Sequence, residues 1–287
     1  MSQTPSSYYL PDPSPWPVIC AGSVFSILLG AGMVVNGLFP GMVLIILGFA
    51  LFGYLLFGWF GDLVKESMAG VYSDQVDASF RLGMIWFIAS EVFFFLSFFG
   101  ALWYLRNVAA DWLTGTGYLA GTNELLYNQF LSEWPRTGPG VTEEFTPMRA
   151  WGVPAFNTVV LLTSGATITW AHWGLKTENR ALLVRGLLAT IALGLLFVIL
   201  QAWEYQEAYQ HLNLTLRSGV YGSTFYILTG FHGLHVTVGA IMLAAILGRS
   251  LRGHFSPENH FGFEAVAWYW HFVDVVWLGL FIFVYML

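Results

Sequence analysis

The chain has 287 residues, of which 56% are apolar, 18% aromatic and only 10% charged, whereas about 25% of the residues in a typical soluble protein are charged. This composition indicates an integral membrane protein and excludes an ordinary soluble domain. The net charge of -6 and the scattered basic residues exclude a nucleic-acid-binding surface. The single cysteine, Cys20, excludes an internal disulfide, a thiolate zinc site and a cysteine-ligated cluster.

Residues 1–17 are polar and rich in proline. Four prolines alternate between Pro11 and Pro17, which prevents a regular helix and predicts an extended segment that Trp16 anchors at the membrane surface. The first fifteen residues contain no Lys or Arg, unlike a secretory signal. The hydrophobic segment that follows is therefore expected to be retained.

Seven hydrophobic segments are long enough to cross a membrane. A helix needs about 20 apolar residues to span a hydrocarbon core of about 30 Å. The predicted spans are residues 18–38, 42–60, 80–107 and 152–173, a fifth span that follows the basic residues of 176–185 and ends near 201, and residues 221–247 and 261–287.

These spans fall into two groups. The two spans within residues 18–60 contain no Asp, Glu, Lys, Arg or His, which predicts a separate apolar hairpin. Residues 61–79 are predicted to form a hydrophilic loop on the side of the N-terminus. Residues 80–287 hold the other five spans, with a long outer loop at 108–151 that is a candidate partner surface.

The distribution of basic residues predicts the orientation of the chain. Seven Lys and Arg residues belong to the side that holds the N-terminus and four to the opposite side, which favours an inside N-terminus and an outside C-terminus. The first group is Lys65, Arg81, Lys176, Arg180, Arg185, Arg249 and Arg252, and the second is Arg106, Arg136, Arg149 and Arg217.

Glu91 is the only ionisable side chain between Arg81 and Arg106. At about 1.5 Å per residue it lies roughly 15 Å from Arg81, near the middle of the bilayer. An ionised carboxylate there costs at least about 2.5 to 3.5 kcal/mol. We therefore expect Glu91 to be protonated, paired or turned toward the interior of the bundle, and both a functional acid and a neutral packing acid remain open.

Spans six and seven carry further polar residues at helical spacing. Thr229, His232 and His235 share one face, and Glu264, His271 and Asp274 follow one stripe. Such stripes predict a buried hydrogen-bonded network that faces neighbouring helices. The predicted members are His232, His235, Glu264, His271 and Asp274, with His172, Gln201 and Glu204 as additional candidates.

The alternative interpretation makes His232, His235 or His271 a ligand of haem or of a metal ion. Interhelical hydrogen bonds need only polar neighbours, whereas ligation needs a coordination geometry, so hydrogen bonding is favoured. We assign no catalytic residue and no metal ligand to this chain.

Several stretches resemble subunit III of the haem-copper cytochrome c oxidases, of the bacterial aa3 type, over nearly the whole chain. They are Pro13-Ser-Pro-Trp-Pro17, Arg81-Leu-Gly-Met-Ile85, Ser90-Glu-Val92, Ala166 to His172, Val220 to Phe225, Gly230 to Val236 and Phe261 to Trp277. The last stretch is the most specific, and the resemblance fades in the 108–151 loop. All seven spans are present, whereas related quinol oxidases typically lack the first two in this subunit, so the resemblance favours a cytochrome c oxidase.

The resemblance implies an all-α polytopic membrane protein of seven transmembrane helices, in bundles of two and five around a V-shaped cleft filled with phospholipid. It also implies that this chain binds no haem or copper, which belong to subunits I and II, and that it packs on subunit I. The complex would oxidise ferrocytochrome c with dioxygen and pump protons. The implied location is the bacterial plasma membrane, with a cytoplasmic N-terminus and a periplasmic C-terminus.

Two features suggest how the chain supports this enzyme. Lys65, Arg249, Arg252 and His254 lie at predicted inner span ends, where they can bind lipid phosphate. The resemblance matches Glu66, Arg249, His254, Phe261 and Gly262 to contacts of cleft lipids. The acidic residues Asp62, Glu66, Asp74 and Asp77 form an inner surface that can collect protons.

Two other classes remain open from the residues alone. A proton-coupled transporter would account for Glu91 but predicts inverted repeats or broken helices, which the sequence does not show. A haem-binding membrane enzyme predicts that the purified chain has a visible spectrum.

Overall fold

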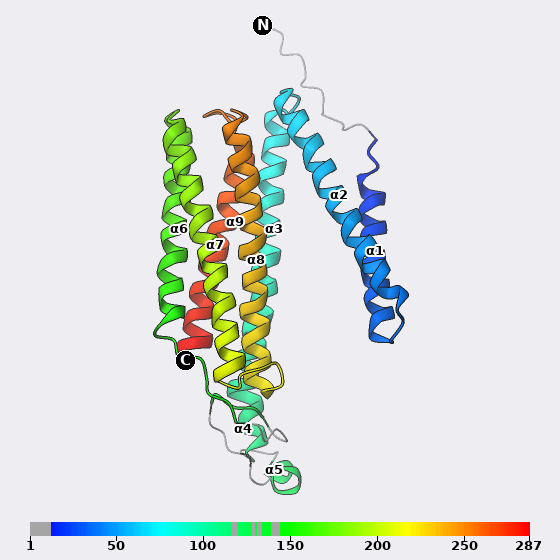
Figure 1. Cartoon of the computed structure of the whole chain (residues 1–287), viewed down its shortest axis with the longest axis vertical. Coiled ribbons are helices and arrows are strands. Elements are labelled where there is room, and N and C mark those ends of the chain that lie inside the picture. The colour runs from blue at the N-terminus through cyan, green and yellow to red at the C-terminus, as the bar shows by residue number, and fades with distance from the viewer. Residues whose placement is uncertain (1–12, 116–119, 128–129, 131–133, 139–143) are drawn as a thin grey trace. The chain divides into compact units, whose positions relative to one another are not determined.

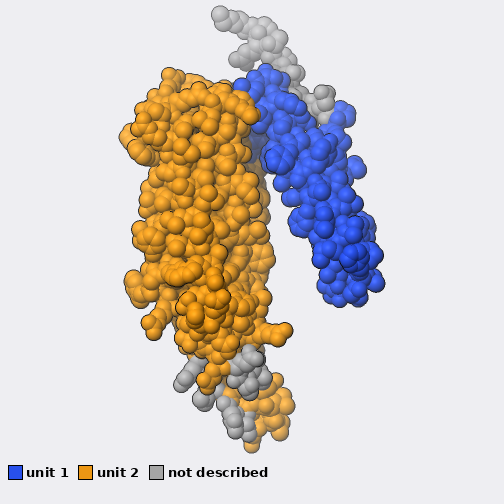
Figure 2. All heavy atoms as spheres, in the orientation of Figure 1, with its two compact units in different colours: residues 1–80 blue, residues 81–287 orange. Residues whose placement is uncertain are grey.

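The computed structural model describes residues 13–115, 120–127, 130, 134–138 and 144–287, and within these residues the regular elements are all helical (Figure 1). The chain divides into two compact units, residues 1–80 and residues 81–287 (Figure 2). Most of the proline-rich segment predicted at residues 1–17 lies outside the described residues.

The first unit contains a helical hairpin of α1 (Trp16–Val35) and α2 (Pro40–Met68). Both helices begin with a proline in the first turn, where the missing N–H is not needed. Gly30 and Gly41 let the two backbones approach closely, because a Cβ atom on Gly30 would lie 2.6 Å from the carbonyl oxygen of Gly41. Ser23 donates a hydrogen bond of 2.9 Å to the carbonyl oxygen of Gly48. Small residues thus allow α1 and α2 to pack closely against each other.

The hydrophilic segment 61–79 is mostly helical, and the prediction of a loop there is wrong. Helix α2 continues to Met68 and α3 (Asp74–Tyr104) begins at Asp74, so only the five residues 69–73 connect them. Hydropathy indicates where a helix leaves the membrane, whereas good helix formers such as Lys65 and Glu66 extend the helix into water.

The second unit is a bundle of long helices in which α6, α7, α8 and α9 run side by side with α3 (Figure 1). Their bounds are α6 Val153–Lys176, α7 Arg180–His211, α8 Gly219–Leu251 and α9 Phe261–Leu280. A π-helical turn, Phe281–Met286, extends α9 to the C-terminus. A π-helical turn (Leu105–Ala109) leads from α3 into the predicted outer loop, where α4 (Ala110–Leu113) and α5 (Ala120–Leu126) follow.

Each predicted span coincides with a long helix, and six of these helices are long and apolar enough to cross a membrane. The helix that falls outside this group is α6, which has 24 residues. Asn157, Ser164 and several threonines lower its hydropathy. The chain is therefore an all-helical, multi-pass membrane protein.

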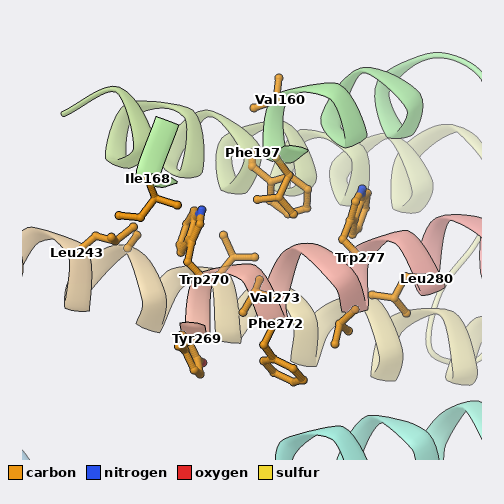
Figure 3. Packing of buried hydrophobic residues seen from close by; sticks show 14 of the residues in the cluster. Val160, Ile168, Phe197, Leu243, Tyr269, Trp270, Phe272, Val273, Trp277 and Leu280 are labelled. Carbon is orange, nitrogen blue, oxygen red and sulfur yellow. The ribbon is translucent and has the colours of Figure 1, made fainter. Parts of the chain in front are cut away.

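Large aromatic residues of α9 fill the centre of the second unit. Trp270 and Trp277 are fully buried, and Figure 3 shows both with Phe197 and Ile168 among the surrounding helices. Each indole N–H donates a hydrogen bond of 2.9 Å, from Trp270 to the Ser164 hydroxyl and from Trp277 to the hydroxyl of Thr158. The polar edge of each ring is thus satisfied inside the bundle.

Two glycines form the space that the Trp270 ring occupies. A Cβ atom would lie 2.6 Å from this ring at Gly194 on α7 and 2.8 Å from it at Gly239 on α8. Even a methyl group at either position would therefore force a displacement of the ring.

We expect Gly239→Ala to destabilise the second unit, because overpacking a filled core costs about 1–3 kcal/mol. Gly100→Ala is the matched control, since a Cβ atom there meets nothing within 4 Å and alanine favours a helix. Thermal unfolding of the two variants in detergent measures the difference. Equal stability of both variants would show that Trp270 is not tightly enclosed.

Candidate functional site

Glu91 of α3 contacts His235 of α8. The Oε2 atom of Glu91 lies 2.9 Å from Nε2 of His235, and the side chains are 23% and 13% exposed. The His235 ring also packs against the rings of Phe95 and Tyr269. The intramembrane carboxyl therefore has a partner inside the bundle, on a helix far away in sequence.

The hydrogen bonds of His235 show that this pair shares a proton. Its Nδ1 lies 2.6 Å from the carbonyl oxygen of Phe231, which only accepts, so Nδ1 carries a hydrogen. In a neutral imidazole Nε2 is then an acceptor. The contact with Glu91 therefore needs one proton between Nε2 and the carboxyl oxygen. The proton belongs either to Glu91, as a carboxylic acid that donates to a neutral histidine, or to His235, as an imidazolium paired with a carboxylate.

A second cluster surrounds Glu264 in the first turn of α9. One of its oxygens, Oε2, forms an ion pair with Arg81 of α3. The other, Oε1, lies 3.3 Å from Nε2 of His260 and 3.7 Å from Nε2 of His172 on α6. The two histidine rings are 5.3 Å apart between centroids. Glu264 thus joins the ends of three helices.

His232 lies fully buried in the core. Its Nε2 is 3.2 Å from the carbonyl oxygen of Val273, to which it donates a hydrogen bond, and its ring packs against Phe197 and Trp277. This environment is that of a hydrogen-bonded core histidine.

His271 and Asp274 form a third polar contact, 3.5 Å between Nδ1 and Oδ2. His271 is 46% exposed in this chain, so its prediction as a buried residue is wrong, whereas Asp274 is buried. Three residues correspond to about 300° of helical rotation, which leaves the two side chains roughly 60° apart around α9. Asp274 therefore turns to the buried side of the helix.

The five residues predicted as one network are divided among separate clusters. His232, His235 and His271 have different partners and do not converge on one point. Together they offer no common site for haem or a metal ion.

Several partners of the buried polar residues were not predicted from the sequence. Gln201 donates to the carbonyl oxygen of Thr229, and the hydroxyl of Tyr205 lies 2.7 Å from that of Thr229. The Tyr285 hydroxyl donates a hydrogen bond of 2.7 Å to Glu204. Gln201 and Tyr205 are four residues apart, a spacing that places them on one face of α7 and could have indicated their shared contact with Thr229. Tyr285 lies in an apolar segment whose sequence does not indicate a polar contact.

Five of the residues predicted to bind lipid lie in the second unit. Arg252 is exposed at the C-terminal cap of α8, whereas Arg249, His254 and Gly262 adjoin one another. The Arg249 guanidinium stacks on the Phe255 ring, 4.4 Å from the ring centre. A Cβ atom on Gly262 would lie 2.8 Å from Nη1 of Arg249. His254 donates its backbone N–H to the carbonyl oxygen of Arg249. Nε of Arg249 and Nδ1 of His254 are both buried and make no hydrogen bond.

Phe261, the fifth, lies beneath the guanidinium of Arg81, 5.2 Å from its ring centre. Lys65 and Glu66 belong to the first unit. Lys65 forms an exposed ion pair of 2.9 Å with Asp62, and Glu66 accepts a hydrogen bond of 2.7 Å from Tyr72.

We expect dicyclohexylcarbodiimide, an apolar reagent that reacts with protonated carboxyl groups, to label Glu91 selectively. Glu264 is held in its ion pair with Arg81, so it should react poorly. Mass spectrometry of the labelled chain locates the adduct, and Glu91→Gln should abolish it. Labelling of Glu66 or Glu264 with Glu91 unmodified would contradict the placement of Glu91 in the membrane interior.

Comparison with known proteins agrees with the resemblance of the sequence motifs. The family described as cytochrome c oxidase subunit III matches residues 6–287. Proteins named cytochrome c oxidase subunit 3 from Tetraodon nigroviridis, Cyprinus carpio and Scyliorhinus canicula are 43%, 42% and 42% identical to the chain. Each alignment covers 99% of this chain and 98% of the relative. This chain therefore belongs to the cytochrome c oxidase subunit III family.

Proposed function

We propose that this chain is the non-catalytic, supporting subunit III of a proton-pumping cytochrome c oxidase. The observation that carries the proposal is its similarity to proteins of that name along 99% of its length. In this role the chain packs directly on subunit I, in the same complex as subunit II. Those subunits bind the haem and copper, and ferrocytochrome c and dioxygen are substrates of the complex.

The local geometry supports a chain without a redox centre. The histidines that were candidates for haem ligands have other partners: His232 donates to a carbonyl oxygen and His235 contacts Glu91. We infer seven transmembrane helices, in which α1 and α2 form a bundle of two and α3 and α6 to α9 a bundle of five.

We further propose a phospholipid phosphate site at the inner end of α8. Its centre is the guanidinium of Arg249, held over Phe255 with the space beside it kept open by Gly262. Buried nitrogen atoms of Arg249 and His254 without a hydrogen-bond partner are the donors that a phosphate would use. Phe261 would line the acyl chains.

The proposed orientation places the N-terminus in the cytoplasm and the C-terminus in the periplasm of a bacterial plasma membrane. The count of seven basic residues against four supports the orientation. Asp62, Glu66, Asp74 and Asp77 would then face the compartment from which the oxidase takes up protons. The names of the relatives favour a cytochrome c oxidase over a quinol oxidase or a transporter.

Arg249→Ala should lower the phospholipid retained by the purified complex, because it removes the charge that binds the phosphate. Arg185→Ala is a suitable control, since Arg185 is an exposed basic residue near the same end of the bundle. Lipid mass spectrometry of the washed complexes gives the comparison. Unchanged lipid content in the Arg249 variant would count against the site.

Removal of this chain should leave the first turnovers of the oxidase intact, because the redox centres belong to other subunits. Loss of the solvated acidic groups should shift the pH dependence of turnover, and the complex should lose activity faster during turnover. Oxygen consumption by complexes with and without the chain, followed over time and across pH, measures both effects. If a fully metallated complex of subunits I and II shows no initial activity, the proposed supporting role is wrong.

A further inference from the structure

The cluster at Glu264 has an unusual arrangement of hydrogen-bond acceptors. Nδ1 of His260 lies 3.0 Å from the carbonyl oxygen of Ser256 and therefore carries the hydrogen of the neutral ring. The lone pair of Nε2 then points away from Ser256, toward Glu264. Histidines that bind metals are commonly fixed in this way, with the other ring nitrogen donating to a carbonyl oxygen.

Three acceptor atoms converge at this point. Nε2 of His260 is 3.3 Å and Nε2 of His172 is 3.7 Å from the same oxygen, Oε1 of Glu264. Both nitrogen atoms are buried, and neither has a hydrogen-bond partner. The three ligand atoms all lie within 4.8 Å of one another. Lone pairs that face each other at these distances need a cation between them.

Arg81 is bound to the other carboxylate oxygen, Oε2, and its guanidinium also stacks on Phe261. The Glu91–His235 contact differs, because there the two atoms are 2.9 Å apart and a single shared proton completes the bond. At Glu264 the spacing is wider and a second imidazole faces the same oxygen.

The spacing fits a tetrahedral zinc ion. Bonds of about 2.0–2.1 Å to nitrogen and oxygen ligands place neighbouring ligand atoms about 3.3–3.4 Å apart in a tetrahedron. The distance from Nε2 of His260 to Oε1 of Glu264, 3.3 Å, has this value, and the distance from Nε2 of His172 to the same oxygen, 3.7 Å, is close to it.

We propose that His172, His260 and Glu264 bind a divalent cation of the zinc class, with water as the fourth ligand. Two imidazoles and one carboxylate form a recognised zinc ligand set. The ion would connect the end of α6 to the start of α9. Because Arg81 offsets part of the carboxylate charge, binding is expected to be weaker than in a structural zinc site and to be reversible with a chelator.

Equilibrium dialysis with radioactive Zn²⁺ tests this site in the intact complex after treatment with a chelator. His172→Gln and His260→Gln should each bind one Zn²⁺ fewer per complex than the unmodified protein. Both variants keep the ion pair between Glu264 and Arg81. The matched control is His211→Gln, because His211 lies 3.8 Å from Glu207 in an exposed pair that belongs to no group of three possible ligands among the described residues. Its zinc stoichiometry should be unchanged.

A second measurement covers the case in which the variants fail to assemble. Crystals of the unmodified complex soaked in Cd²⁺ should give an anomalous peak bounded by His172, His260 and Glu264. Absence of this peak, or unchanged zinc stoichiometry in both histidine variants, overturns the proposal and assigns the cluster to protonated histidines alone.

Discussion

Polar side chains inside a membrane must find partners within the protein, because hydrocarbon offers none. In the second unit this requirement determines which helices meet. The Glu91–His235 contact joins α3 to α8, and the contacts of Glu264 join α3, α6 and the start of α9. The indole of Trp270 connects α9 to Ser164 on α6. The apolar side chains fill the space around these contacts, and the polar side chains determine which helices pack against each other.

Some buried polar atoms in the described part of the second unit have no such partner. Around Arg249 and His254, nitrogen atoms stay buried without a partner at the end of α8, where lipid headgroups lie in the proposed orientation. Around Glu264, acceptors converge from two other residues. An anion would suit the first group, as in the proposed lipid site, and a cation would suit the second, as in the proposed zinc site. Both groups lie near the start of α9.

Hydropathy predicted the position of every long helix, because a membrane span needs a minimum length of apolar sequence. It did not predict the ends of α2 and α3, since helices continue into water where no hydrophobic signal remains. The periodicity of α8 and α9 indicated polar stripes, but it cannot tell which helix a stripe faces. Glu91 and His235 are 144 residues apart, and Arg81 and Glu264 are 183 apart. Only the assembled bundle shows these pairs.

The polar character of α6 has a consequence for the biogenesis of the chain. A helix rich in Ser, Thr and Asn gains little by entering the bilayer alone, so α6 depends on a partner during insertion. Helix α7 suits this role, since it follows after a short turn and the hydroxyl of its Thr190 lies 2.7 Å from that of Thr167 on α6. Its Gly186 leaves room for Ala171 to approach. The translocon would then release α6 and α7 into the lipid as one hairpin, after both have left the ribosome.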